Sequence, residues 1–136
     1  MQNNPTFVPV VAVALLDRQG RVLMQQRPAH KDHGGLWEFP GGKVEPAETL
    51  ECALVREIAE ELAIALDPAA LEPFSFASRP QQPHVVMLYI CRDWQGDPQA
   101  IEAAAIGWFA PDELGALAMP PLDVTLSTML QRRLKR

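Results

Sequence analysis

The sequence has 136 residues, a mass of 15.0 kDa and a formal net charge of −5 at pH 7. This length fits one domain, because domains commonly contain about 100–150 residues, and a hydrophobic content of 48% argues against disorder. The acidic balance, with a pI near 5.1, argues against a nucleic-acid partner, which would require a basic face. We therefore expect a single domain spanning residues 1–136.

The apolar run at residues 7–16 predicts a strand rather than a leader or a membrane anchor. No basic segment precedes the run, Pro9 interrupts it, and it is too short to span a bilayer. We expect no membrane partner and a cytoplasmic location. Cys52 and Cys91 fall within an expected helix and strand, so we predict that both are buried free thiols.

In the first third of the chain, a turn at residues 17–20 leads to a second strand at 21–26, which we expect to pair with the first as a hairpin. Pro28 ends that strand. The polar, glycine-rich segment at 30–35 is a candidate lid, and residues 37–39 predict a short strand. His30 and His33 lie in the lid segment, and the sequence assigns neither of them a role.

The rest of the chain predicts a helix after the Gly41-Gly42 pair, then strands at 71–78 and 84–92, with the second placed centrally in its sheet. A loop at 93–100, a short strand at 106–109 and a short helix at 111–117 follow. Pro120-Pro121 begins a last helix that runs to about Leu134. Periodicity alone indicates an α/β or α+β fold.

Three glutamates crowd one face of the first helix: Glu57, Glu60 and Glu61. Residues three and four apart are neighbours on a helix, so the carboxylates repel one another, and we expect Arg56 to project to the flank. An apolar stripe beside them, with an i, i+4 spacing, predicts ordinary core (Leu50, Leu54, Ile58 and Leu62). The acidic face is either solvated or bound to Mg²⁺ or Mn²⁺, hard cations that oxygen ligands suit.

At these residues the sequence resembles the Nudix hydrolases. The box of that family is matched, at its spacing, from Gly42 to Ile64 (Gly42, Glu48, Arg56, Glu57, Ile58, Glu60, Glu61 and Ile64). One position departs, because Ala63 stands where the family usually has glycine, which predicts a helix that continues slightly or ends differently. The preceding LWEFPGGK segment is similar to that of MutT-type nucleoside triphosphate pyrophosphohydrolases.

The resemblance implies a Nudix fold, in which helices sandwich a mixed β-sheet, and an Mg²⁺-dependent hydrolase for which Mn²⁺ could substitute. It implies metal ligands at Glu57, Glu60, Glu61 and the Gly42 carbonyl, with Arg56 orienting the glutamates. Glu48 either bears directly on catalysis or braces the loop. Glu102, in the loop before Trp108, is either a further metal ligand or a solvated loop residue.

The same resemblance implies the substrate-binding residues. Arg27 is either a phosphate contact or a surface arginine, and Asp123 either binds the base or caps the last helix. The remaining candidates surround the glycine pair (Phe39, Gly41 and Lys43). A carboxylate at Asp123 suits both the amino group of cytosine and the extra N–H of an oxidised guanine.

The implied reaction converts (deoxy)nucleoside triphosphates to the monophosphate and pyrophosphate. Oxidised dGTP (8-oxo-dGTP) is the first expected substrate, which would place the protein in DNA repair, and CTP or dCTP is the alternative. Other nucleoside-diphosphate-linked substrates, such as ADP-ribose and dinucleoside polyphosphates, form a further alternative, and a non-catalytic binding module another. The sequence leaves open a monomer or a homodimer.

Overall fold

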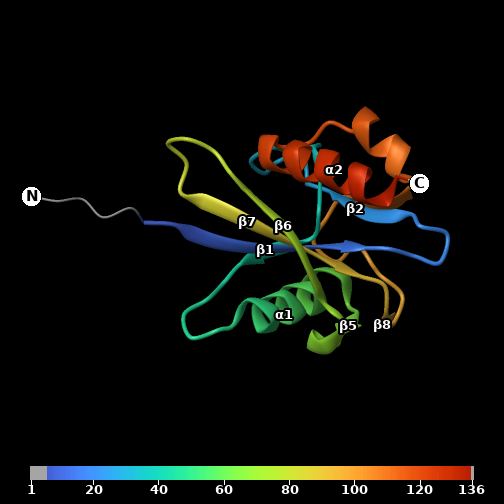
Figure 1. Ribbon diagram of the computed structural model, residues 1–136, viewed down its shortest axis with the longest axis horizontal. Coiled ribbons are helices and arrows are strands. Elements are labelled where there is room, and N and C mark those ends of the chain that lie inside the picture. Colours follow the sequence, from blue (N-terminus) through green and yellow to red (C-terminus); the bar gives the residue numbers. More distant parts are fainter. Residues whose placement is uncertain (1–5, 136) are drawn as a thin grey trace, which may run out of the picture.

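The structure is a computed structural model that describes residues 6–135. Strands form its centre, with the long helix α1 (Leu50–Leu62) on one side and the long helix α2 (Pro121–Leu134) on the other (Figure 1). This arrangement confirms the predicted fold class, a mixed sheet between helices. Among the described residues, no helix is long and apolar enough to cross a membrane.

The larger sheet has four strands in the order β4-β1-β7-β6. β1 and β7 run parallel, whereas the other two pairings are antiparallel. β7 has a neighbour on both sides, which confirms the central position predicted for it. The bounds of these strands are Val8–Leu15 (β1), Gly41–Lys43 (β4), Glu72–Ser78 (β6) and His84–Cys91 (β7).

A three-stranded antiparallel sheet has the order β3-β2-β9, with bounds Trp37–Glu38, Val22–Gln26 and Ala105–Phe109. The predicted hairpin between the first two strands was wrong. β1 and β2 belong to different sheets, and a single antiparallel bridge joins Leu16, just after β1, to Val22 at the start of β2. β2 pairs instead with β9, more than 80 positions later in the chain.

Two short strands, β5 (Ala65–Leu66) and β8 (Trp94–Gln95), pair with each other, so the segment at 93–100 is not wholly loop. The predicted helix at 111–117 is a 3₁₀ helix, Pro111–Ala116, and a second 3₁₀ turn covers Pro68–Ala70. The predicted bounds of the last helix are close to those of α2.

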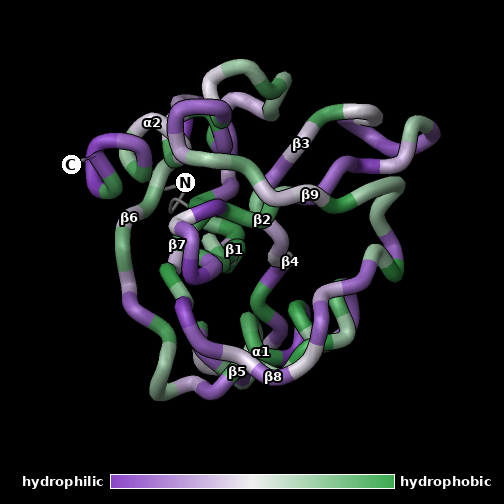
Figure 2. The backbone as a smooth tube through the Cα atoms, turned by 90° about the vertical axis from the view of Figure 1, so that its right-hand side faces the viewer, coloured by the Kyte–Doolittle hydropathy of each residue, from purple (hydrophilic) through white to green (hydrophobic). Residues whose placement is uncertain are grey.

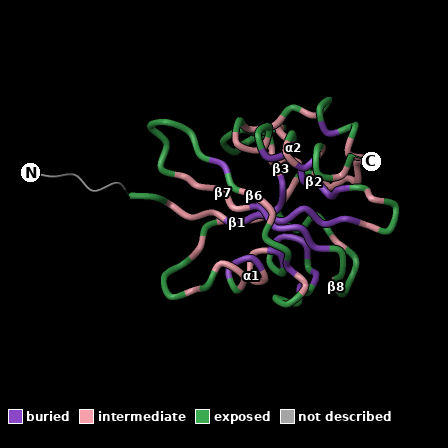
Figure 3. Tube along the Cα trace, in the orientation of Figure 1, coloured by how far each residue is buried: buried purple, intermediate pink, exposed green. Residues whose placement is uncertain are grey.

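Side chains of β1 alternate between two cores, because successive residues of a strand point to opposite faces. Val11, Val13 and Leu15 pack with the apolar stripe of α1, whereas Ala12 and Ala14 pack with buried leucines of α2. β1 lies near the middle of the view in Figure 2 and is largely hydrophobic there. The buried segments converge at the centre in Figure 3, with exposed loops around them.

The two cysteines differ in their surroundings. Cys91 is buried in β7, as predicted, and burial raises the pKa of its thiol. Cys52 is exposed on the first turn of α1, which corrects the prediction that it is buried. The apolar stripe of the helix contains Leu50 and Leu54, and Cys52 falls between them on the outer side.

Candidate active site

Helix α1 is fixed at both ends by local hydrogen bonds. The Thr49 hydroxyl accepts a hydrogen bond of 3.1 Å from the Cys52 N–H at the N-terminus. At the C-terminus, Ala63 adopts the left-handed conformation (φ 59°, ψ 34°), and its N–H donates to the Ala59 carbonyl at 3.1 Å. The helix therefore ends where a glycine cap would end it, and the expectation that alanine changes the exit was wrong.

Arg56 lies at the centre of a carboxylate network rather than on the flank, which corrects the sequence prediction. Its guanidinium donates two hydrogen bonds to Glu48, at 2.7 and 2.9 Å. The same group reaches Glu57 at 3.0 Å and Glu60 at 3.5 Å. The hydrogen bonds from Arg56 lower the pKa of Glu48 to about 2. Glu48 also accepts a hydrogen bond from the Glu45 N–H and so braces the loop before α1.

The two glycines of β4 meet different neighbours. A Cβ on Gly41 would lie 1.9 Å from the Val11 carbonyl oxygen, so this glycine is required by the pairing of β4 with β1. A Cβ on Gly42 would lie 2.3 Å from the carboxyl carbon of Glu57. Because Gly42 has no side chain, the Glu57 carboxylate can occupy the space beside it. The side chain of Lys43 is exposed, and its carbonyl accepts a hydrogen bond from Arg56.

Glu61 is the buried member of the cluster, at 7% exposure. Burial is the main reason that its pKa rises to about 8, with further contributions from Glu57, Glu38 and Glu102. Its Oε1 accepts a hydrogen bond of 2.8 Å from the Gln25 amide. Its Oε2 is buried and, among the described residues, has no hydrogen-bond partner. A buried oxygen without a partner costs free energy, so this atom is free to accept a hydrogen bond or bind a cation.

A small cavity of about 80 Å³ is lined by three of the predicted site residues, Arg27, Glu61 and Glu102. The Arg27 guanidinium also forms an ion pair of 3.0 Å with Glu38. Glu102 itself lies in an exposed segment. Gln25 lines the same cavity, and the sequence reasoning missed it. A polar residue directly after three apolar positions of a buried strand was the signal that could have revealed it.

A larger cavity of about 460 Å³ lies beside the start of α2. Asp123 lines it, and one carboxylate oxygen of Asp123 accepts a hydrogen bond of 3.0 Å from the Phe39 N–H. The structure shows no side-chain cap on α2, whose N-cap is Pro120, so the capping alternative was wrong. Burial is the main cause that raises the pKa of Asp123 to about 7. The Phe39 ring is packed in the core on the α2 side instead of lining the cavity.

Further residues line this larger cavity that the sequence reasoning did not assign. The polar and charged ones among them come from the lid segment, from β3, from the connection between β6 and β7 and from the start of β7 (His33, Glu38, Arg79, Gln82 and His84). Glu38 also lines the small cavity, so it lies between the two. His30 lines neither cavity.

The donor set fits a hard divalent cation. It offers carboxylate oxygens at Glu57, Glu60 and Glu61, one of them buried and unpartnered, and a glycine that admits a carboxylate beside the main chain. Within residues 6–135, no three acidic, histidine or cysteine side chains converge as a complete cage. Arg56 accounts for part of this, because it draws Glu57 and Glu60 toward itself.

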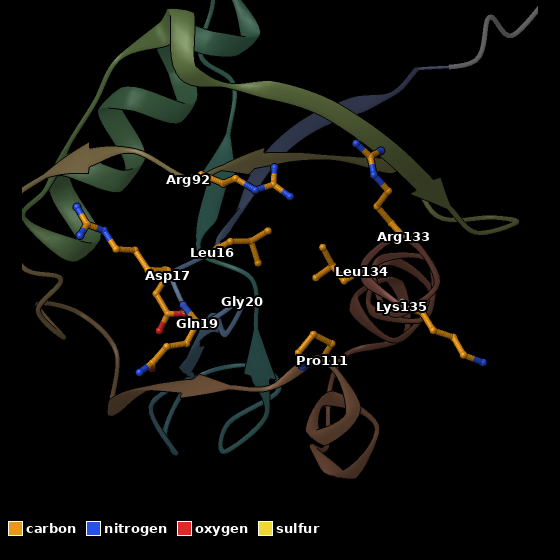
Figure 4. A pocket seen from close by; sticks show the side chains of 10 residues that line it. Leu16, Asp17, Gln19, Gly20, Arg92, Pro111, Arg133, Leu134 and Lys135 are labelled. Carbon is orange, nitrogen blue, oxygen red and sulfur yellow. The ribbon is translucent and has the colours of Figure 1, made fainter.

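A further cavity, of about 750 Å³, lies at the far end of β1 from Asp123, between the β1–β2 turn and the end of α2. Figure 4 shows Leu16 and Leu134 facing each other across it, with Arg92 and Arg133 at its rim. Both arginines have a structural partner, since each forms an ion pair with Glu72. None of the predicted site residues lines this cavity.

Together these features define a class of small α/β/α protein. Its carboxylate-rich site lies between helix α1, strand β4 with its two glycines, and the buried Gln25 of β2. The family model of the NUDIX domain matches residues 6–131, and the chain belongs to the Nudix family. With the relatives described next, this makes the protein a Nudix hydrolase of the MutT type.

Two curated relatives are similar over most of their length. The CTP pyrophosphohydrolase of Escherichia coli (strain K12) is 39% identical over 118 residues, which are 85% of this chain and 86% of the relative. The 8-oxo-dGTP diphosphatase of Haemophilus influenzae is 33% identical over 121 residues, 88% of each chain.

Solved structures agree with the fold. MutT, from work on Aliivibrio salmonicida and Vibrio cholerae, superposes with a TM-score of 0.83 at 26% identity and covers 94% of this chain and 99% of that chain. The solution structure of the E. coli ORF135 protein gives a TM-score of 0.78 at 36% identity, covering 93% and 90%.

Proposed function

We propose that this protein is an Mg²⁺-dependent pyrophosphohydrolase that converts (deoxy)nucleoside triphosphates to the monophosphate and pyrophosphate. The observation that carries the proposal is the buried Oε2 of Glu61, which has no hydrogen-bond partner within residues 6–135. It lies on the acidic face of α1, in a cavity that Arg27 also lines. A carboxylate held out of water, with one oxygen free and an arginine nearby, suits a cation that is shared with phosphate oxygens.

Glu57, Glu60 and Glu61 would hold the cation, with the Gly42 carbonyl and Glu102 as further ligands. When bound, Mg²⁺ (or Mn²⁺ in its place) would neutralise charge on the phosphoryl oxygens and lower the pKa of bound water. The residues of the chain do the positioning. Arg56 restrains Glu57 and Glu60 through hydrogen bonds, and Glu48 holds the arginine in place from the other side.

Arg27 is the phosphate-binding candidate. It is 29% exposed, anchored by Glu38 at 3.0 Å, and lies at the cavity that contains Glu61. Lys43 is exposed on β4 and would add positive charge at the rim. Gly41 would contribute indirectly, because it allows β4 to lie against β1 and so sets the position of Gly42. The Phe39 main chain would act through its hydrogen bond to Asp123.

The cavity of about 460 Å³ is the candidate site for the base. Its Asp123 keeps one oxygen for a ligand while Phe39 occupies the other. A carboxyl group there can accept from the amino group of cytosine or from the N–H of an oxidised guanine. The E. coli CTP pyrophosphohydrolase has the higher identity, which favours CTP or dCTP, and the 8-oxo-dGTP diphosphatase relatives support oxidised dGTP as the second candidate.

A substrate panel tests the proposal. Purified protein would be incubated with Mg²⁺ and with CTP, dCTP, 8-oxo-dGTP, dGTP, ADP-ribose and a dinucleoside tetraphosphate, and pyrophosphate and phosphate would be assayed separately. We expect pyrophosphate release from one or more triphosphates, with kcat/KM highest for a cytosine or an oxidised guanine nucleotide. Hydrolysis of ADP-ribose alone, or of nothing with either Mg²⁺ or Mn²⁺, would exclude the proposed reaction.

A further inference from the structure

We propose that Gln25 is a positioning residue for the cation site, and that its neutral amide fixes Glu61 so that Oε2 is presented to the metal. The inference rests on the proposed function, because it assigns a role within the same site. Gln25 lies on β2, outside the helix and the glycine loop that carry the sequence motif.

The burial of Gln25 requires an explanation. It is 4% exposed, in the middle strand of the three-stranded sheet. A buried amide is costly unless its hydrogen bonds are made. The Nε2 group of Gln25 has two hydrogens and two carboxylate acceptors, Glu61 Oε1 at 2.8 Å and Glu38 Oε2 at 3.3 Å. The second contact follows from strand pairing, since Gln25 and Glu38 are register partners between β2 and β3.

The chemistry of an amide matches this position better than the alternatives. A lysine or arginine would neutralise Glu61 and compete with a cation for it. An aliphatic residue would leave Oε1 without a partner in addition to Oε2, and a glutamate would add a third negative charge beside Glu61 and Glu38. The amide satisfies one oxygen of Glu61 and adds no charge of its own, so the second oxygen is restricted to one direction.

The adjacent glutamine provides a matched control. Gln26 follows on the same strand, so its side chain points to the opposite face. It donates a hydrogen bond of 3.1 Å to the Gly35 carbonyl in an exposed setting. Replacing either glutamine with methionine keeps the length of the side chain and removes the donor. Gln26 also borders the small cavity, but the hydrogen bond to Glu61 comes from Gln25.

The test measures Mn²⁺ binding to the full chain by titration, with electron paramagnetic resonance detection of free Mn²⁺. We expect Gln25→Met to weaken Mn²⁺ affinity about tenfold or more, the scale on which loss of an outer-shell partner weakens metal sites. We expect Gln26→Met to leave the affinity unchanged. Gln25→Lys provides a second variant if Gln25→Met does not fold. It retains a donor for Glu61, which should allow folding, and it adds a positive charge, which should weaken Mn²⁺ binding.

Kinetics at saturating Mg²⁺ complete the test. Gln25→Met should lower kcat about tenfold with a smaller change in KM for the nucleotide, because Arg27 keeps its ion pair with Glu38. Wild-type Mn²⁺ affinity and wild-type kcat in Gln25→Met would overturn the proposal. If the wild-type protein binds Mn²⁺ but hydrolyses no triphosphate, the proposed function fails, whereas the comparison of Mn²⁺ affinities still decides the role of Gln25.

Discussion

Asp123 and Phe39 are 84 positions apart in the chain and are joined by a hydrogen bond of 3.0 Å from the Phe39 N–H to the Asp123 carboxylate. The bond ties the start of α2 to the segment between β3 and β4. A second bond, from the Trp37 N–H to the Ala118 carbonyl at 2.8 Å, runs between the same two regions. The base cavity and the glycine pair are therefore held in fixed relation by these two hydrogen bonds.

Asp123→Asn should change the choice of base. The amide can still accept from the Phe39 N–H, but it cannot become negatively charged. We expect the ratio of kcat/KM for CTP and 8-oxo-dGTP to shift about tenfold, equivalent to about 1.4 kcal/mol. Since the pKa of Asp123 is raised to about 7, the wild-type ratio should also vary between pH 6 and 8, and the variant ratio should not. Asp97→Asn, on an exposed loop, is the control. Equal kcat/KM ratios in the wild type and both variants would show that Asp123 has no role in base recognition.

Gly42→Ala should separate activity from folding. The new Cβ would overlap the Glu57 carboxylate, which lies at the end of a flexible side chain and can move. We expect a loss in kcat of at least about tenfold and a melting temperature close to that of the wild type. Gly115→Ala places a Cβ 3.8 Å from Gln131 Nε2, an ordinary contact, and should preserve both quantities. Full activity in Gly42→Ala would mean that the position of Glu57 does not matter.

Glu61 should make the metal-free protein sensitive to alkaline pH. Its pKa is about 8 in the folded protein against 4.5 for an ordinary glutamate, so the folded state retains a proton that the unfolded state releases. This stabilisation is complete below pH 4.5 and is lost as pH rises through 8. In EDTA, the free energy of unfolding should therefore fall by a few kcal/mol, to order of magnitude, between pH 5 and 8.

The Glu61→Gln variant provides the comparison, because it cannot titrate at this position. Its free energy of unfolding should fall less over the same pH interval, which urea denaturation would measure. Added Mg²⁺ should stabilise the wild type more as pH rises, since binding displaces the proton. The variant should lose at least about 10²-fold in kcat, the effect of removing one electrostatic stabiliser of the transition state. Parallel pH profiles for the two proteins would contradict the buried, protonated state of Glu61.

Ala63→Gly should stabilise the protein. Ala63 has φ 59°, a conformation that costs an L-residue about 1 kcal/mol relative to glycine. We expect a gain of about 0.5–1 kcal/mol and a rise of about 2–5 °C in the melting temperature. Ala59→Gly, on the exposed face of the same helix, should instead destabilise by about 1 kcal/mol. A calorimetric scan of both variants would test the opposite signs.

The sequence was informative where contacts are local. The three glutamates, Arg56 and Gly42 belong to one continuous stretch, so helical spacing and the resemblance were enough to place them together. The apolar stripe on α1 was predicted for the same reason and lies in the core. The orientation of Arg56 was not predictable, because it depends on hydrogen bonds to Glu48, which lies in the loop before the helix.

Contacts between distant segments were harder to predict. Gln25 reaches Glu61 only because β2 pairs with β3 and β9 instead of β1, and periodicity does not identify the partner of a strand. The lining of the base cavity by Arg79 and His84 depends in the same way on where β7 lies beside β1. Ala63 was mispredicted for a different reason, since alanine does not favour the left-handed conformation that it adopts here.

The alternation of β1 between two cores has a consequence for tolerance to insertions. One added residue within β1 would send Val11, Val13 and Leu15 to the α2 side and their small neighbours to the α1 side, so both halves of the molecule would lose complementarity in a single step. Extra residues in the exposed connection at 79–83 would leave this pairing untouched. Length changes in this protein should therefore be confined to its connecting turns.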